Sequence, residues 1–245
     1  MIRSRFGLLG LCAVLFGVMA FGTTAAQAEV GAQWLFAEKG AGTKLIPFLE
    51  ASIQLEKDSP TYVLHSKILG VAVLFLCTEL KLVNAVLKAN GSIGEGFKIL
   101  FSGCTTDLNG VANANCTPND VTDGLGVIVT QNLHALLVLG ELAGGVKDDL
   151  LKILPDTGET FDNMEFGSKC PIGTKIPVIG KLMFKDCANE ALTHLVKHLL
   201  EPAPAPFTEL WTISKTAEHQ ATLLGSFWAF LTGAHEGLKF SGDPA

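Results

Sequence analysis

Two histidines four residues apart are the residues whose types and spacing most directly suggest chemistry. His194 and His198 lie in the segment THLVKHLLE, and Glu190 extends the row at the same interval. These side chains share one face whether the segment is a helix or a strand, because either period brings every fourth residue to the same side. Two imidazoles and one carboxylate can hold a zinc ion in a hydrolytic site. Glu190, His194 and His198 are therefore the candidate metal ligands of this chain.

The specific metalloprotease pattern is missing from that segment. It requires a glutamate directly after the first histidine, as the general base, and Leu195 occupies this place. If the segment is a helix, His194 and His198 lie on its polar face, where two solvated histidines are the simpler interpretation. We therefore expect no metal and no other cofactor, and we keep a secreted, metal-assisted hydrolase as the alternative function.

Other catalytic patterns are equally weak. No serine has glycine at both flanking positions of the G-x-S-x-G nucleophile turn. Cys77 lies in AVLFLCTEL, with no adjacent cation to favour the thiolate that a nucleophilic cysteine needs. We expect no catalytic residue, and an enzyme is the less favoured interpretation.

Most of the chain consists of short segments rich in Val, Ile, Leu, Phe and Thr, which favour strands. They cover residues 61–65, 70–87, 97–102, 126–139, 150–154, 174–184, 207–213 and 221–231. Between them lie turn-forming dipeptides, such as Asn90-Gly91, Asn109-Gly110 and Asp123-Gly124. This spacing predicts a mainly β fold, a single-domain antiparallel sandwich or barrel of about ten to thirteen strands with at most one or two short helices.

The Asn90-Gly91 pair also predicts a strand register. A two-residue hairpin turn at this point pairs positions whose numbers add to 181, so that Leu80 faces Phe101 and Leu82 faces Ile99 on one apolar side. Cys77 lies opposite Cys104 in the same register.

Five cysteines follow the apolar N-terminal segment, and an oxidising environment would pair four of them. Cys170 and Cys187 bracket CPIGTKIPVIGKLMFKDC, which we interpret as two paired strands that a bridge between these cysteines would close. Cys104 is expected to be bridged in either remaining arrangement, locally to Cys116 or across the hairpin to Cys77. Both arrangements stay open.

Residues 105–124 form the longest polar stretch, TTDLNGVANANCTPNDVTDG. A loop of this length in a compact domain is usually either functional or pinned down, and Cys116 is the candidate pin. Its Asp and Asn side chains could ligate calcium, but their tendency to form turns explains them better.

The N-terminus has the features of a secretory signal peptide. Arg3 and Arg5 precede an apolar run, and a small-residue triplet ends at Ala28, so we expect residues 1–28 to be removed and residues 29–245 to form one disulfide-linked β domain. No second apolar span follows, so we expect no transmembrane anchor after removal of the signal. The chain is therefore predicted to be secreted, either extracellular or periplasmic and envelope-associated.

The net charge of −6 bears on the partners of the protein. Nucleic acid and anionic lipid are bound by clustered Lys and Arg, and this chain has no basic run, so we expect neither partner. A protein partner or self-association through strand edges and apolar patches stays possible.

Four stretches resemble those of a group of uncharacterised secreted bacterial proteins: ILGVAVLFLCTELKLVNAVL, FSGCTTDLNG, CPIGTKIPVIGKLMFKDC and ISKTAEHQATLLGSFWAFLTGAHEGLKFSG. The resemblance extends from near Trp34 to the C-terminus, and it implies a bacterial source, export and a mainly β fold without any activity. The apolar residues within 190–201 have helical spacing, but the resemblance and the β-rich surroundings favour a strand. We therefore expect a non-catalytic exported protein that acts by binding or as a structural component, in the cell envelope or outside the cell.

Overall fold

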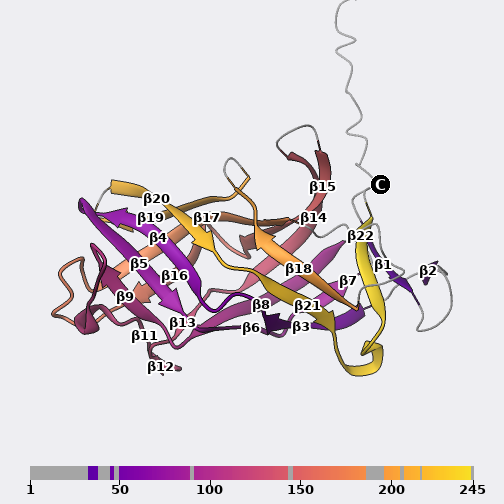
Figure 1. Ribbon diagram of the computed structural model, residues 1–245, viewed down its shortest axis with the longest axis horizontal. Coiled ribbons are helices and arrows are strands. Elements are labelled where there is room, and N and C mark those ends of the chain that lie inside the picture. Colours follow the sequence, from indigo (N-terminus) through magenta and orange to yellow (C-terminus); the bar gives the residue numbers. More distant parts are fainter. Residues whose placement is uncertain are drawn as a thin grey trace, which may run out of the picture. The chain divides into compact units, whose positions relative to one another are not determined.

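The computed structural model describes residues 33–37, 45–46, 50–88, 91–142, 146–185, 196–204, 207–215 and 217–243. In these residues the chain forms more than twenty β-strands and no α-helix (Figure 1). Two 3₁₀ turns, Ala114–Cys116 and Gly233–His235, are the only helical elements in this part of the chain. The predicted mainly β class is confirmed, with a barrel as the architecture, and the predicted number of strands was too low.

The number was too low because one apolar run can contain several strands and because strands with a polar face were missed. Residues 70–87 were predicted as one segment but contain β5 (Val71–Cys77), β6 (Glu79–Val83) and β7 (Val86–Lys88). The strands β3 (Glu50–Lys57) and β16 (Thr160–Glu165) have polar or charged residues between their apolar ones, so they lack a continuous apolar run.

Eight antiparallel strands close into a barrel. In ring order they are β3, β7, β8 (Ser92–Ser102), β14 (Leu133–Leu142), β15 (Val146–Pro155), β17 (Lys175–Lys185), β18 (Lys197–Pro202) and β21 (Phe227–Leu231), which pairs with β3 again. Closure of the ring removes the open strand edges that a flat sheet would expose.

A second sheet continues from this barrel. The long strands β8 and β17 extend beyond the ring and take new partners (Figure 1). Strand β17 belongs to both the ring and the second sheet, and β8 pairs with β6 beside that sheet. The order of the second sheet is β16, β17, β19 (Glu209–Ser214), β20 (Ala217–Leu224), β4 (Tyr62–Ile68), β5, β9 (Thr105–Leu108) and β10 (Val111–Ala112). The short strand β13 (Ile128–Val129) pairs with the end of β8 and lines the same apolar interior.

Two smaller sheets complete the described fold. One contains β2 (Leu45–Ile46), β1 (Gln33–Ala37) and β22 (Lys239–Asp243), and the other is a hairpin of β11 (Asn119–Asp120) and β12 (Gly124–Leu125). All described strands belong to one compact unit that begins at residue 31.

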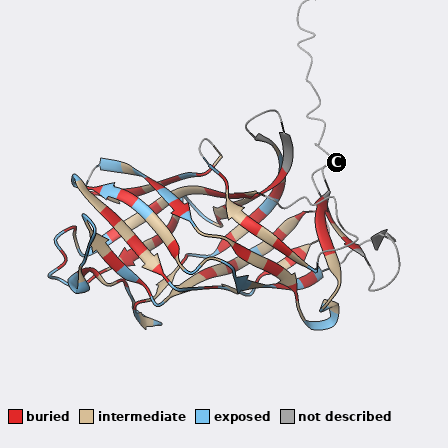
Figure 2. Cartoon of the chain, viewed as in Figure 1, coloured by how far each residue is buried: buried red, intermediate tan, exposed pale blue. Residues whose placement is uncertain are grey.

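Alternation of buried and more exposed residues along the strands builds the core. In β5, Val73, Phe75 and Cys77 are buried and the residues between them are only half-buried. The same alternation occurs in β8, where Phe97 and Ile99 are buried, and Figure 2 shows it as changing colours along the strands. Because successive side chains of a strand point to opposite faces, each strand contributes one face to the interior.

The predicted pairing of β6 with β8 is confirmed, but the same register does not extend to the turn, because Leu87 of β7 pairs with Ile93 of β8, a sum of 180. Strand β6 pairs with β8 so that Leu80 faces Phe101 and Leu82 faces Ile99, as expected from a sum of 181. Strand β5 pairs with β9 in the same register, because Val73 faces Leu108. The two strand pairs therefore form one long ladder that extends from the barrel into the second sheet.

A disulfide lies at the interruption of this ladder. Cys77, the last residue of β5, is bonded to Cys104, which lies between β8 and β9, and their Cα atoms are 4.0 Å apart. Of the two arrangements left open for Cys104, the chain thus has the cross-strand one. The bond joins the two strands at the point where they pass from one sheet to the other.

The predicted bridge between Cys170 and Cys187 is wrong. Cys170 is bonded to Cys116, with an S–S distance of 2.07 Å. The segment between Cys170 and Cys187 is no strand pair, since Lys175–Lys185 form the single strand β17. Because a cysteine forms one disulfide, the bond of Cys170 to Cys116 leaves it none for Cys187. Cys187 itself lies outside the described residues.

Gly180 explains why a turn was expected inside β17. Its φ of +116° is rarely adopted by residues with a side chain, and an added Cβ would lie 2.0 Å from the backbone oxygen of Glu209. The strand continues through Gly180 and exchanges β16 for β15 as a neighbour. A glycine that suggests a turn in the sequence therefore marks the passage of one strand between two sheets.

Several predictions concern residues beside or outside the described parts of the chain. Residues Lys197–Pro202 form strand β18, as favoured over a helix. Glu190 and His194 lie outside the described residues, and so does the predicted signal peptide, residues 1–28. In the part of the chain that the structure describes, no helix is both long and apolar enough to cross a membrane.

The disulfide arrangement can be checked by digesting the unreduced protein and identifying linked peptides by mass spectrometry. We expect peptides joined through Cys77 and Cys104 and through Cys116 and Cys170, both of which separate after reduction. A peptide that joins Cys170 to Cys187 would contradict the continuous strand β17.

Candidate functional site

The candidate site lies where a strand pair of the barrel separates. Strands β14 and β15 are paired along their whole length, ending at Leu133 and Pro155. Beyond these residues the two strand partners diverge, because β13 pairs with β8 and β16 pairs with β17. Between residues 127–131 and 160–165, all of them described, the one backbone hydrogen bond runs from Gln131 N–H to the Phe161 carbonyl, at 2.6 Å. We call this gap between β13 and β16 the seam.

The separation point is held by Asp156. Its Oδ2 accepts a hydrogen bond from the backbone N–H of Gly96 at 2.8 Å, and its Oδ1 lies 3.2 Å from Nδ1 of His134. Its own backbone N–H donates to the carbonyl of Asn132 at 2.9 Å. These bonds connect β8, β14 and the start of the loop before β16. They fix the place where the strand pair of β14 and β15 separates.

A polar pocket of about 300 Å³ lies in the seam. It is lined by residues 119–123 of the β11–β12 hairpin, by residues 127–131, by residues 162–165 of β16, and by Lys98 and Lys175. We call it the seam pocket, and we call the hairpin its roof. The walls thus come from five separate parts of the chain, which the barrel strands hold in place.

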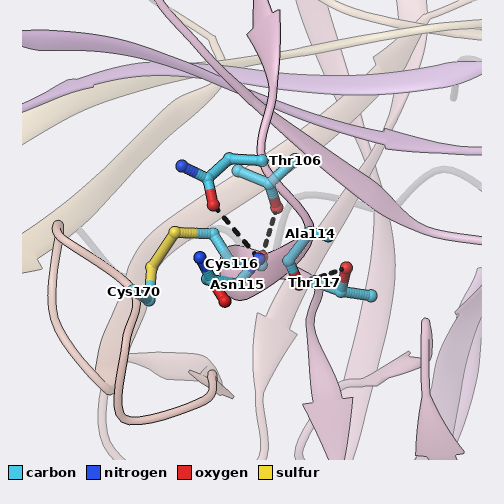
Figure 3. The surroundings of a disulfide bond; sticks show 7 residues. Thr106, Ala114, Asn115, Cys116, Thr117 and Cys170 are labelled. Carbon is cyan, nitrogen blue, oxygen red and sulfur yellow. Dashed lines mark hydrogen bonds between the residues drawn. A yellow bond between two sulfur atoms is a disulfide. The ribbon is translucent and has the colours of Figure 1, made fainter.

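The second disulfide anchors the roof. Cys116, shortly before β11, is bonded to Cys170, which follows β16 (Figure 3). The carbonyl of Cys116 also accepts a hydrogen bond from the Thr106 hydroxyl at 2.6 Å. A bond that closes 54 residues stabilises a fold by about 4 kcal/mol in the chain-entropy model. Cys116 thus anchors the polar stretch 105–124, but this stretch is not the single loop that was expected, since it contains β9, β10, a 3₁₀ turn and β11.

A β-bulge turns Asp162 toward the interior. The register between β16 and β17 shifts between Thr160 and Asp162, so that Phe161 and Asp162 are both buried although they are neighbours in a strand. Only 8 % of Asp162 is exposed. Bulges of this kind often redirect a side chain at a functional site. Asp162 lines the seam pocket on one side and an apolar cavity on the other.

Burial raises the pKa of Asp162 to about 7. Loss of hydration is the main cause, and the negative charges of Asp120 and Glu165 raise the pKa further. The backbone N–H of Asn163 and the cation of Lys175 act in the opposite direction without cancelling the effect of burial. Asp162 therefore changes its charge near neutral pH, unlike an ordinary solvated aspartate.

The apolar cavity behind Asp162 has a volume of about 70 Å³. Most of its wall consists of apolar side chains of the second sheet, among them Phe75, Phe101 and Leu223. Ile128, Thr130, Asp162 and Met164 line both this cavity and the seam pocket. A thin wall of four side chains, one of them a carboxyl group, thus separates a polar space from an apolar one.

The predicted metal ligand His198 does not face solvent. It belongs to the inward face of β18, with 2 % of its surface exposed, and its Nε2 is hydrogen-bonded to the backbone carbonyl of Phe240. The imidazole also packs edge-on against the Phe240 ring, with centroids 4.6 Å apart. Burial lowers the pKa of His198. This histidine connects β18 to β22, and the solvated position expected for a helix does not apply.

The described residues therefore do not bring the three candidate zinc ligands together. Glu190 and His194 lie outside them, and His198 uses Nε2 for a structural bond. No group of three or more His, Cys, Asp or Glu side chains in the described ranges could hold a metal ion. In the polar loop, Oδ1 of Asp120 accepts the backbone N–H groups of Thr122 and Asp123 at 2.8 and 2.9 Å, as turn formation predicts.

Sequence reasoning missed Asp162, although a signal for it exists. Phe161, Met164 and Phe166 of TFDNMEF are all buried, but their spacing fits the two-residue period of a strand only if one extra residue follows Phe161. An interrupted alternation of this kind indicates a bulge. The polar residue beside the interruption, Asp162, is then the one whose side chain is redirected.

Comparisons with known proteins assign no role to this site. No family model, no curated protein and no solved structure matches the chain. The chemistry of the seam pocket therefore follows from its own residues. Near neutral pH the carboxyl group of Asp162 can donate a proton, accept a hydrogen bond or pair with a cation.

Replacing Asp162 by asparagine should reveal the cost of its burial. The folded protein retains this proton up to about pH 7, and an unfolded chain releases it near pH 3.8, so the folded state binds more protons between these values. Its free energy of unfolding must then fall as the pH rises through this range, by about 4 kcal/mol in total. We expect Asp162→Asn to change stability little at pH 4 and to raise the free energy of unfolding by about 2–4 kcal/mol at pH 8.

Urea denaturation at both pH values measures this difference. Asp107→Asn, on β9 and outside the described pockets, is the matched control and should change stability equally at both pH values. A variant Asp162→Asn that is no more stable than the wild type at pH 8 would show that the carboxylate is well solvated or paired.

Replacing His198 by alanine should destabilise the fold. The change removes a buried ring and leaves the Phe240 carbonyl without its partner, which together cost about 2–4 kcal/mol. His65→Ala, an exposed histidine on β4, is the control and should cost little. Equal stability of both variants in urea denaturation would be inconsistent with a buried His198.

Proposed function

We propose that this chain is an exported, non-catalytic binding protein that holds a small molecule in the seam pocket. The observation that carries the proposal is the position of Asp162, a buried carboxyl group between a polar pocket and an apolar cavity. Burial of such a group lowers stability, as its raised pKa indicates. Residues that lower stability in this way concentrate at functional sites.

The geometry of the seam pocket supports binding. A pocket of about 300 Å³ is at the lower end of the range for small-molecule sites, and it combines a few polar groups with apolar surface behind them. Its walls belong to strands and to a disulfide-anchored hairpin, which fix side chains better than free loops do. The pocket can thus present a defined set of groups to a ligand.

Export is supported by the cysteines and by the N-terminal sequence. Two disulfides are consistent with an oxidising environment, because cytosolic thiols are kept reduced. The predicted signal peptide and the resemblance to secreted bacterial proteins point in the same direction. We propose that the protein acts in the cell envelope or outside the cell.

Binding is favoured over catalysis by the composition of the site. Acid–base catalysis of hydrolysis usually takes a second group, a base or a nucleophile, at hydrogen-bond reach of the reacting atoms. Among the described residues, Asp162 has no side-chain hydrogen-bond partner that could fill this role. The alternative of a metal-assisted hydrolase loses support as well, since Nε2 of His198 is engaged by Phe240.

Amide NMR of the labelled protein can test the proposal with a mixed set of small amines, alcohols, amides and carboxylic acids. We expect at least one compound to shift signals of residues 119–131 and 162–165, in a saturable manner. Val129→Trp, which fills part of the pocket, should abolish these shifts and leave the spectrum of the barrel intact.

A different outcome would contradict the seam pocket as the binding site. Saturable shifts elsewhere, for example around the surface hollow that includes Trp211 and Glu218, would place binding on another face. Saturable shifts of seam residues that persist in Val129→Trp would also show that the compound does not bind inside the seam pocket.

A further inference from the structure

We infer that the seam pocket selects a small primary amine with a short branched apolar group, and that Asp162 pairs with its ammonium. This inference rests on the proposed function and adds the class of ligand. Three observations lead to it: the charge balance of the pocket, the missing counter-ion of Asp162 and the apolar cavity behind it.

The pocket has more negative than positive side chains. Its carboxylates are Asp120, Asp123, Asp162 and Glu165, and its cations are Lys98 and Lys175. Lys175 and Glu165 lie 3.4 Å apart as an ion pair and neutralise each other. Above about pH 7, where Asp162 is ionised, three carboxylates and the single cation of Lys98 remain in the lining. A positively charged ligand then balances the pocket better than a neutral or negative one.

Asp162 lacks a cation of its own. No Lys, Arg or His nitrogen of the described residues lies within ion-pair distance, 4.0 Å, of its carboxyl group. A carboxylate removed from water without a counter-ion is unfavourable, and a cation in contact with it restores the missing interaction. An ammonium group also donates three hydrogen bonds, which suits a site rich in carboxylate oxygens.

The apolar cavity indicates the rest of the ligand. Its volume of about 70 Å³ begins directly behind Asp162. An engineered cavity of roughly 150 Å³ takes up benzene, so this one fits a smaller group such as a branched chain of three or four carbons. Met164 lies in the wall between pocket and cavity, and its unbranched side chain can move to admit such a group.

Binding of an amine must depend on pH. The ammonium is charged over the whole range, but its partner is ionised only above about pH 7, where Asp162 releases its proton. The other charged groups around Asp162 are Asp120 and Asp123 of the roof, Lys98 of β8, Glu165 of β16 and Lys175 of β17. Tyr62, across the cavity, stays neutral because burial raises its pKa. Affinity should therefore fall as the pH drops below 7.

Three probes that share a four-carbon branched skeleton test this inference: isobutylamine, isobutanol and isobutyrate. Amide NMR titrations at pH 8 should show saturable shifts at residues 127–131 and 162–165 with isobutylamine, and at least tenfold weaker binding of the other two. The affinity for isobutylamine should fall by roughly tenfold per pH unit below pH 7. Asp162→Asn should weaken amine binding at least tenfold, and the control Asp107→Asn should not.

The possible failures are distinguishable. Binding of isobutanol or isobutyrate in the seam pocket as tight as that of the amine overturns the selection of amines and leaves the seam pocket as the binding site. Amine binding that is independent of pH or of Asp162→Asn overturns the role of Asp162. If none of the three probes shifts residues of the seam pocket, the inference is wrong, and if the mixed compound set also fails there, so is the proposed function.

Discussion

The backbone of a β-strand has to find hydrogen-bond partners along both edges, and this constraint organises the described structure. Eight strands meet it by closing a ring. The second sheet shares β17 with that ring, and β8 continues beyond the ring to pair with β13, but β13 and β16 stay apart. The unclosed place is where a hairpin lies over a polar pocket. The site therefore owes its position to a local failure of strand pairing inside an otherwise continuous sheet.

Much of the architecture follows from local patterns, but the site does not. The alternation of apolar residues correctly predicts that Leu80 faces Phe101, because register brings the apolar side chains to one face. Closer to the turn the register differs by one residue, since Leu87 pairs with Ile93. The bond between Cys116 and Cys170 joins residues 54 apart, and no local pattern reports such a contact. Asp162 was missed because a bulge reverses its direction, so an apparently surface-type residue becomes buried. Long-range pairing and single-residue irregularities are the two things that periodicity does not encode.

Asp162 and His198 show that burial of a polar group can have opposite meanings. His198 has a hydrogen-bond partner for Nε2 in the Phe240 carbonyl, so its burial connects two strands, although its Nδ1 is buried without a partner in the described residues. Asp162 has no cationic partner in the described residues, and its burial lowers stability at neutral pH. A buried group with its partner inside the protein is structural. A buried group that lacks one is where a molecule from outside can supply the missing interaction.

The disulfide that anchors the roof makes the completion of the pocket depend on oxidation. The loop that ends in Cys116 is attached to the loop after β16 by a bond that forms only under oxidising conditions. In a chain whose thiols are still reduced, the strands of the pocket wall can form, but the roof lacks its attachment to the loop after β16. Completion of the site is therefore coupled to the oxidation of Cys116 and Cys170. The redox state of its surroundings thus decides whether the hairpin is fixed over the pocket.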